Sequence, residues 1–287
     1  MDNILNRGYG GINMNVYEER FKDKVLLVTG STTGIGRAVA IRAAKEGAKV
    51  VVVGRRKEKG EEVVDEIRQD GGEAMFVQID LSSEESSKQL IETVVNQYGR
   101  LDIAINNAGT MGKDIQIHNL EQEEMDRVMN INFFSTVYCC HYEIQQFMKQ
   151  QTGGVIINNA SVAGLVAVAG LPAYNASKHA VNGLTKALAI DYAKYGIRVN
   201  SVNPAQTDTP MTRQAKIDIS RKVRDAKKAG IENPMSVITT LSCKTTNMQQ
   251  RAATPEEHAA SILYLASDDA THITGAMVQT DGGWSSF

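Results

Sequence analysis

The stretch TGSTTGIG at residues 29–36 follows the apolar, strand-length run KVLLVTG and opens a helical pattern over residues 36–47. Its glycines, Gly30, Gly34 and Gly36, suit a tight turn, a backbone close to a pyrophosphate, and close packing of a helix on a strand. A helix that starts here also offers free N–H groups and the positive end of its dipole to phosphate oxygens. Three glycines alone are a weak signal, but a strand, a turn and a helix in this order predict a dinucleotide site.

Further apolar runs of strand length follow this turn, and helical patterns separate them. Such runs suit strands that are covered on both faces, as in a parallel sheet. The alternation predicts right-handed βαβ crossovers and one α/β, Rossmann-like, doubly wound parallel sheet of about seven strands flanked by helices. The expected strands are 24–30, 49–54, 75–80, 101–107, 155–161, 198–204 and 277–283, and the expected helices are 36–47, 59–72, 83–99, 120–150 and 174–196.

The composition suits one large domain with a substantial core, since 42% of the 287 residues are hydrophobic. A net charge of -2 favours neither a nucleic acid nor a membrane as partner, and no apolar run approaches the length of a membrane span. The cysteines Cys139, Cys140 and Cys243 are few and odd in number, which fits a reducing, cytoplasmic location. No metal site is predicted.

We expect an N-terminal arm over residues 1–22 and a single domain over residues 23–287, because no repeat or linker interrupts the pattern. The arm lacks the basic start and apolar stretch of a signal peptide. It is either a mobile tail or a segment that docks through Tyr17 and Phe21 on the domain or a neighbouring subunit. The segment 208–251 is long, strandless and mixed in charge.

The motif YNASK at residues 174–178 places a tyrosine and a lysine four residues apart, hence on one face of a helix. A free phenol has a pKa near ~10 and is a poor base at neutral pH, but a nearby ammonium group lowers that pKa. Taken alone, Tyr174 and Lys178 also fit an ordinary amphipathic helix with a surface lysine.

Several motifs standing in one order make the chain resemble the short-chain dehydrogenase/reductases, in their shorter single-domain branch, from about Lys24 to Gly283. The glycine spacing of TGSTTGIG is similar to this family's cofactor turn. NNAG (106–109) resembles the motif beside the adenine ribose, and NPAQTDTP (203–210) resembles the turn that holds the nicotinamide amide. The resemblance implies cofactor contacts from Gly30, Ser31, Thr32, Thr33, Gly34, Ile35, Gly36, Asp80, Leu81, Asn107, Ala108, Gly109, Tyr174, Lys178, Pro204, Thr207 and Thr209.

The resemblance also implies four catalytic residues: Ser161, thirteen residues before Tyr174, then Tyr174 and Lys178 of YNASK, and Asn132 in MNINFF. Tyr174 would be the general acid in reduction and the general base in oxidation, and Lys178 would lower its pKa and hold the nicotinamide ribose. Ser161 would donate a hydrogen bond to the substrate oxygen, where negative charge develops. Asn132 would hold a water that links Lys178 to solvent.

Two residues depart from the family pattern in the turn after the sixth expected strand. Ala205 follows Pro204 where the family usually has glycine, and Thr207 stands where valine or isoleucine is usual. Alanine disfavours a positive φ at this point, so the local geometry around the nicotinamide is left open.

The end of the second expected strand, VVVGRRK, bears on the choice of cofactor. NAD sites usually carry an acidic side chain here, but this chain has Gly54 followed by Arg55 and Arg56. An arginine can pair with a 2′-phosphate and stack on the adenine, so we favour NADP(H), with Arg55 as the contact. NAD(H) stays possible, because Thr33 stands where many NADP enzymes of the family have a basic residue.

The uncharged stretch VAGLVAVAGLP (162–172) favours an apolar ketone or secondary alcohol as substrate. By resemblance, the segment 208–251 is the substrate-binding lid, and its length and methionines suggest a bulky substrate such as a hydroxysteroid or bile acid. Its apolar residues are Met211, Ile217, Ile219, Val223, Met235, Val237, Ile238 and Leu241.

Other functions remain to be weighed against this one. The basic residues of the lid could meet an acyl carrier, which would make the chain a 3-oxoacyl carrier reductase. A non-catalytic cofactor sensor would not need Ser161, Tyr174 and Lys178. The close spacing of Tyr174 and Lys178 disfavours an enoyl reductase. The resemblance further implies a homotetramer, with DGGWSSF (281–287) near a subunit contact.

Overall fold

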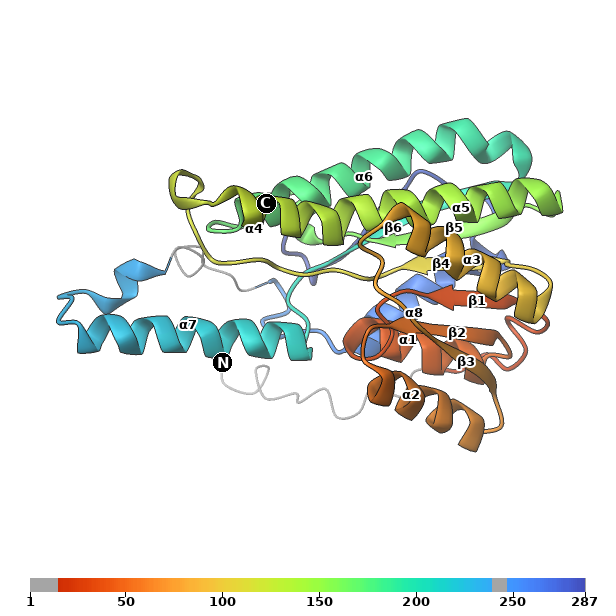
Figure 1. The fold of residues 1–287 in the computed structure, drawn as a ribbon, viewed down its shortest axis with the longest axis horizontal. Helices are drawn as coiled ribbons and strands as arrows, with labels where there is room; N and C mark the ends of the chain where they lie inside the picture. Colours follow the sequence, from red (N-terminus) through yellow and green to blue (C-terminus); the bar gives the residue numbers. More distant parts are fainter. Residues whose placement is uncertain (1–14, 239–246, 287) are drawn as a thin grey trace, which may run out of the picture.

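The computed structural model describes residues 15–238 and 247–286, and its centre is a seven-stranded sheet of order β3-β2-β1-β4-β5-β6-β7 (Figure 1). Every neighbouring pair of strands is parallel. The predicted fold class is therefore confirmed. The strands are β1 Val25–Val28, β2 Lys49–Gly54, β3 Glu73–Gln78, β4 Ile103–Asn106, β5 Gly154–Asn159, β6 Ile197–Pro204 and β7 Met277–Thr280.

Helices cover both faces of this sheet and form two separate cores. Leu26 and Val28 of β1 pack with α1, α2 and α8, whereas Val25 and Leu27 pack with α3, α5 and α6. This division follows from the alternation of side chains along a strand. The helices are α1 Gly34–Lys45, α2 Lys57–Gln69, α3 Glu84–Tyr98, α4 Gln122–Met129, α5 Ser135–Gln150, α6 Pro172–Tyr192, α7 Pro210–Lys228 and α8 Pro255–Ala266.

Two helices were not predicted from the sequence. Helix α8 begins with a capping box in which Thr254 and Glu257 bond each other's backbone N–H groups. The letters TPEE at residues 254–257 carry that signal. Helix α7 lies within the segment 208–251, and it projects beyond the sheet and its covering helices (Figure 1). Among its described residues, Ala226 is the one that is buried.

The helix expected over residues 120–150 is divided into α4 and α5 by a π-helical turn at Asn130–Phe134. Such turns place one extra residue in the helix and are frequent at functional sites. Here the turn carries Asn132, whose side chain is fully buried between the two helices and α6.

The described part of the expected arm is held to the domain by Phe21. This side chain is 1% exposed, and its N–H donates to the carbonyl of Glu46 at 2.8 Å. Tyr17, the other expected anchor, is 53% exposed and stacks on the Arg20 guanidinium. The rest of the arm, residues 1–14, and residues 239–246 of the expected lid, which include Leu241, lie outside the described residues.

Within the described ranges, none of the helices is both long enough and apolar enough to span a bilayer.

Candidate active site

A cavity of about 690 Å³ opens at the carboxyl ends of the strands, where the strand order reverses between β1 and β4. This is the place where open α/β sheets bind their ligands, and the volume suits a cofactor with a small molecule. One end is formed by the turn before α1 and by the ends of β2 and β3. The other end is lined by apolar residues near α6 and α7.

The turn before α1 has the backbone that a pyrophosphate requires. Gly30 and Gly34 have φ of 63° and 59°, in the left-handed region that side chains disfavour. A Cβ at Gly36 would lie 2.4 Å from Asn107 Nδ2, so only glycine lets α1 pack this closely. The cap residue Thr33 makes no side-chain cap bond, which leaves the first N–H groups of α1 for an anion. These residues fit the diphosphate of a dinucleotide.

Three predicted site residues lie behind the cavity wall. The Ser31 hydroxyl donates to the carbonyl of Val28 at 2.7 Å and accepts from Val53 N–H at 2.9 Å, so it ties the turn to β1 and β2. Gly36 and Asn132 do not line the cavity either. The other predicted residues all line it.

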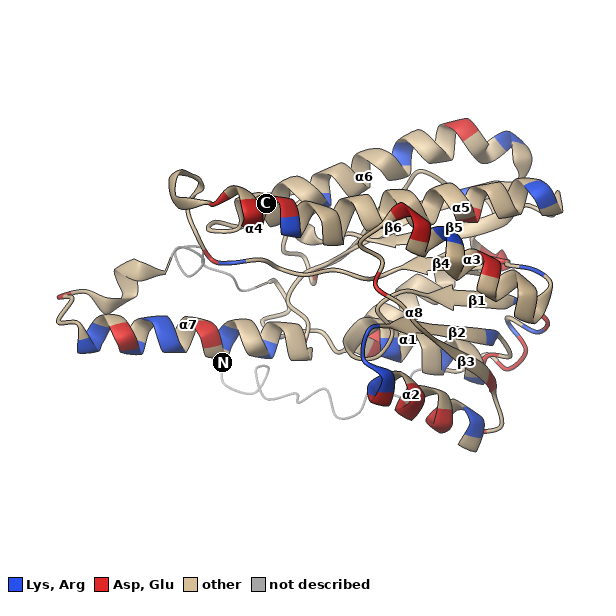
Figure 2. Cartoon of the chain, in the orientation of Figure 1, with Lys and Arg blue, Asp and Glu red and all other residues tan. Residues whose placement is uncertain are grey.

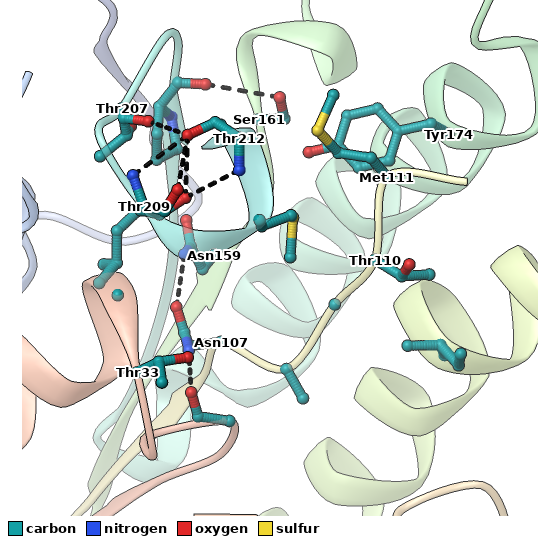
Figure 3. A pocket seen from close by; sticks show the side chains of 18 of the residues that line it. Thr33, Asn107, Thr110, Met111, Asn159, Ser161, Tyr174, Thr207, Thr209 and Thr212 are labelled. Atoms are coloured by element: carbon teal, nitrogen blue, oxygen red, sulfur yellow. Dashed lines mark hydrogen bonds between the residues drawn. The ribbon is translucent and has the colours of Figure 1, made fainter. Parts of the chain in front are cut away.

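Asn107 of the NNAG motif fastens the same turn from the side of β4. Its Nδ2 donates to the carbonyls of Thr29 and Gly30, at 3.0 and 3.1 Å. Its Oδ1 accepts from Asn159 Nδ2 at 2.8 Å, which joins the ends of β4 and β5 (Figure 3). The predicted motif therefore supports the cofactor turn as well as lining the cavity.

Both arginines after β2 line the cavity, but they differ in their partners. Arg55 pairs with Asp80, with Nη1 and Oδ2 3.5 Å apart, and both side chains are exposed. Arg56 Nη2 donates to Thr32 Oγ1 at 3.0 Å and to Thr33 Oγ1 at 3.2 Å. The residue that reaches the cofactor turn is thus Arg56, for which the sequence analysis assigned no role.

Helix α6 brings Tyr174 and Lys178 to the cavity from its first two turns. Lys178 Nζ donates to the carbonyl oxygen of Asn159 at 2.9 Å and lies 5.8 Å from the centroid of the Tyr174 ring. Burial lowers the pKa of Lys178 to about 8. Pro172 suits the start of the helix for two reasons. Its ring fixes φ near the helical value, and its nitrogen has no N–H that would need an acceptor.

The expected direction of the Tyr174 pKa is not found. Burial raises this pKa above its usual value, and a hydrogen bond with Ser161 opposes the rise. The ammonium group of Lys178 points to the carbonyl of Asn159 rather than to the phenol. Burial is therefore the largest influence on this pKa from the protein groups, and the prediction that Lys178 lowers it stays a prediction.

Ser161 stands where β5 turns into a short 3₁₀ helix, Val162–Gly164. Its hydroxyl accepts from Ala163 N–H at 3.1 Å and lies 3.4 Å from the carbonyl oxygen of Pro204. Ser161 and Tyr174 thus approach each other from different elements, thirteen residues apart in the sequence.

Asn132 links the loop after β4 to α6. Its Oδ1 accepts from Thr110 N–H at 2.7 Å, and its Nδ2 donates to Thr110 O at 2.9 Å and to Ser177 Oγ at 3.0 Å. Ser177 immediately precedes Lys178, so Asn132 supports α6 from behind the cavity.

The turn after β6 holds both departures from the family pattern. Ala205 is not among the described non-glycine residues with positive φ, so alanine is unstrained there. The Thr207 hydroxyl donates to Ala205 O at 3.0 Å and lies 2.8 Å from His258 Nε2. Thr209 caps α7 in a capping box with Thr212. His258 was missed by sequence reasoning, and the unusual hydroxyl at Thr207 was the available signal.

The far end of the cavity is apolar, as the stretch 162–172 and the lid predicted. The expected residues Val162, Val168, Leu171, Met211 and Ile219 line it, whereas Ile217 and Met235 of the lid do not. Lys216 contributes a charged side chain at this end. Lining residues that sequence reasoning missed are Met111, Ile131 and Trp284.

Comparisons with known proteins agree with this geometry. Residues 24–220 match the model of the family described as short chain dehydrogenase. A 3beta-hydroxysteroid dehydrogenase of Mediterraneibacter gnavus is 46% identical over 97% of this chain and 99% of its own length. A cyclohexanol dehydrogenase of an Acinetobacter species is 35% identical over 94% and 98%. The crystal structure of levodione reductase superposes with a TM-score of 0.80 at 31% identity, covering 93% of this chain and 99% of that chain.

Proposed function

Because this chain belongs to the short-chain dehydrogenase family, and is therefore an oxidoreductase that acts on CH–OH groups with a nicotinamide cofactor, we propose that its substrate is a hydroxysteroid or the corresponding ketone. The observation that carries the proposal is the apolar wall beside Tyr174 and Ser161, formed by Met111, Val168, Leu171 and residues of α7. A rigid, apolar ring system buries more surface against such a wall than a sugar or a short thioester does. The similarity to a 3beta-hydroxysteroid dehydrogenase supports the same class.

Each catalytic side chain has a task that its position allows. Tyr174 would give a proton to the substrate oxygen in reduction and take one in oxidation, and Ser161 would hold that oxygen by its hydroxyl. Lys178, held by Asn159, would bind the nicotinamide ribose and carry protons, for which a pKa of about 8 is suitable. The bound cofactor supplies or accepts the hydride.

We propose NADP(H) as the preferred cofactor, with NAD(H) as the alternative. A Cβ at Gly54 would lie 2.5 Å from Thr32 Cγ2, so an acidic side chain at this position requires Thr32 to move. Arg55 and Arg56 both line the adenine end and supply the positive charge that a 2′-phosphate prefers.

The charges of α7 leave the acyl-carrier alternative open, because basic residues outnumber acidic residues on this helix. Figure 2 shows acidic and basic residues mixed along this helix. Arg213 pairs with Asp208, Arg221 with Asp218, and Lys222 with Asp114. These ion pairs use part of the positive charge of α7, and the thioester in the substrate test below decides whether an acidic carrier binds there.

A cytoplasmic homotetramer is also part of the proposal. Ile190 on α6 is 80% exposed, which suits a surface that another subunit covers. Light scattering coupled to gel filtration would measure the mass, and a monomer at micromolar concentration would contradict the tetramer.

The test of the substrate is the oxidation of NADPH and NADH against ketosteroids, a bile-acid ketone, an acetoacetyl thioester and a sugar. We expect turnover of the steroid or bile-acid ketone, with the higher kcat/KM for NADPH. Turnover of the thioester or the sugar alone would overturn the proposal.

A further inference from the structure

A buried histidine on α8 contacts the cavity turn from behind. His258 is 2% exposed, and its two ring nitrogens face two threonines on different elements. Nε2 lies 2.8 Å from Thr207 Oγ1, and Nδ1 lies 3.1 Å from Thr280 Oγ1 at the end of β7. The ring thus bridges the end of the sheet and the turn that lines the cavity.

The hydrogen bonds run in one direction along this bridge. Thr207 donates its proton to the carbonyl of Ala205, so its oxygen is left to accept from His258 Nε2–H. A neutral imidazole then accepts at Nδ1 from the Thr280 hydroxyl. Burial lowers the pKa of His258 to about 4, so the ring is neutral at neutral pH.

The backbone around Thr207 is tied to the same region. Ala253 N–H donates to Gln206 O at 2.9 Å, and Asp208 N–H donates to Ala253 O at 2.9 Å. These bonds hold the backbone on both sides of Thr207, whereas its side chain contacts Ala205 O and His258. An aliphatic residue at position 207 could not make this contact.

We propose that His258 is a positioning residue that fixes the turn 204–209 through Thr207 and thereby sets the affinity for the cofactor. The chain lacks the usual glycine at position 205 and the usual aliphatic residue at 207, and the bond from His258 holds the turn that these two residues form. The inference rests on the proposed function only in that the turn receives the nicotinamide end of the cofactor.

The test uses Trp284, which is the protein's single tryptophan and lines the same cavity. Its fluorescence would report NADPH binding without any turnover. The variants are Thr207→Val, His258→Leu and the double variant. Thr207→Val leaves the buried Nε2–H of His258 without its acceptor, whereas the double variant removes both partners. His141→Leu, at an exposed histidine on α5, is the matched control.

We expect each single variant to raise the Kd for NADPH about 5- to 10-fold. The double variant should raise the Kd by much less than the product of the two single-variant fold-changes. His258→Gln, which keeps a donor, should recover part of the affinity. The control should bind as the wild type does.

An unchanged Kd in both single variants, or multiplication of their effects in the double variant, would overturn the proposal. If His258→Leu does not fold, as judged by thermal unfolding, His258→Phe, which also lacks both ring nitrogens, replaces it in the cycle with Thr207→Val. Wild-type protein that binds NADPH but reduces no steroid would refute the proposed substrate and leave this test intact, because its readout is cofactor binding alone.

Discussion

The ammonium group of Lys178 is bonded to the backbone carbonyl of Asn159, at 2.9 Å, and not to a side chain. This bond fastens the second turn of α6 to the carboxyl end of β5. Because a carbonyl carries no net charge, it does not offset the cost of burying an ammonium, and the pKa of Lys178 falls to about 8.

The first prediction concerns Lys178 and pH. The pKa of this lysine is about 8 in the folded protein, against 10.5 for the ordinary group. The unfolded chain binds more protons between these values, so the wild type should gain stability as the pH rises through this range. Between these pH values, the free energy of unfolding of the wild type should rise by up to about 3 kcal/mol relative to that of Lys178→Met, as measured by urea unfolding. If the free energy of unfolding depended on pH in the same way for both proteins, this prediction would be contradicted.

Tyr174→Phe should lower kcat by about 10³-fold, because in the proposed mechanism the phenol transfers the proton. The Kd for NADPH, read from Trp284 fluorescence, should stay within about twofold, since the ring and its packing remain. A variant that keeps wild-type turnover would remove Tyr174 from the mechanism.

Replacing the two arginines after β2 one at a time should test whether each of them favours NADPH over NADH. Arg56→Ala removes the bonds to Thr32 and Thr33, and Arg55→Ala removes the pair with Asp80. We expect each to raise the Kd for NADPH about tenfold, with little change for NADH, because a 2′-phosphate gains most from an arginine. The matched control is Lys57→Ala, an exposed cation of α2. If a variant lost equal affinity for NADPH and NADH, the replaced arginine would not select between the two cofactors.

Glu143 of α5 predicts a pH dependence of the opposite sign. It is buried, Asn106 Nδ2 donates to its Oε2 at 3.1 Å, and burial raises its pKa to about 8. Its contribution to stability is complete below pH 4.5 and is lost as the pH rises toward 8. Glu143→Gln should therefore stabilise the protein by up to about 3 kcal/mol at neutral pH, measured by urea unfolding. Glu92→Gln, at an exposed glutamate, should show no such gain.

A contact between α7 and the loop after β4 should affect the substrate and not the cofactor. Lys222 of α7 donates to the carbonyl of Asp114 at 2.6 Å, and the same helix carries Ile219 and Met211 of the apolar wall. Lys222→Ala should raise the KM for a steroid about threefold, since the contact is exposed, and leave the Kd for NADPH unchanged. Lys227→Ala, farther along the helix, is the control. A KM as in the wild type would show that this contact does not hold α7.

The strands could be predicted closely because a strand covered on both faces is a continuous apolar run. The run 49–54 coincides with β2, and the others differ from the observed strands by a few residues at their ends. Helices α7 and α8 were not predicted. Helix α7 has an apolar stripe at helical spacing, formed by Met211, Ala215, Ile219, Val223 and Ala226. This stripe was an available signal for α7, as was the capping box at Thr254 for α8.

The sequence by itself determined the succession of strands and helices along the chain, the glycine turn, and the spacing of Tyr174 and Lys178. Each of these is a property of residues that are neighbours in the sequence. The tertiary structure alone decided which groups meet across the sheet. Ser31 and Asn132 lie behind the cavity, and Arg56 donates a hydrogen bond to Thr32. His258 contacts Thr207, which is 51 positions away in the sequence. The tertiary structure also decided the direction of the Tyr174 pKa, because burial depends on every segment that packs around a side chain.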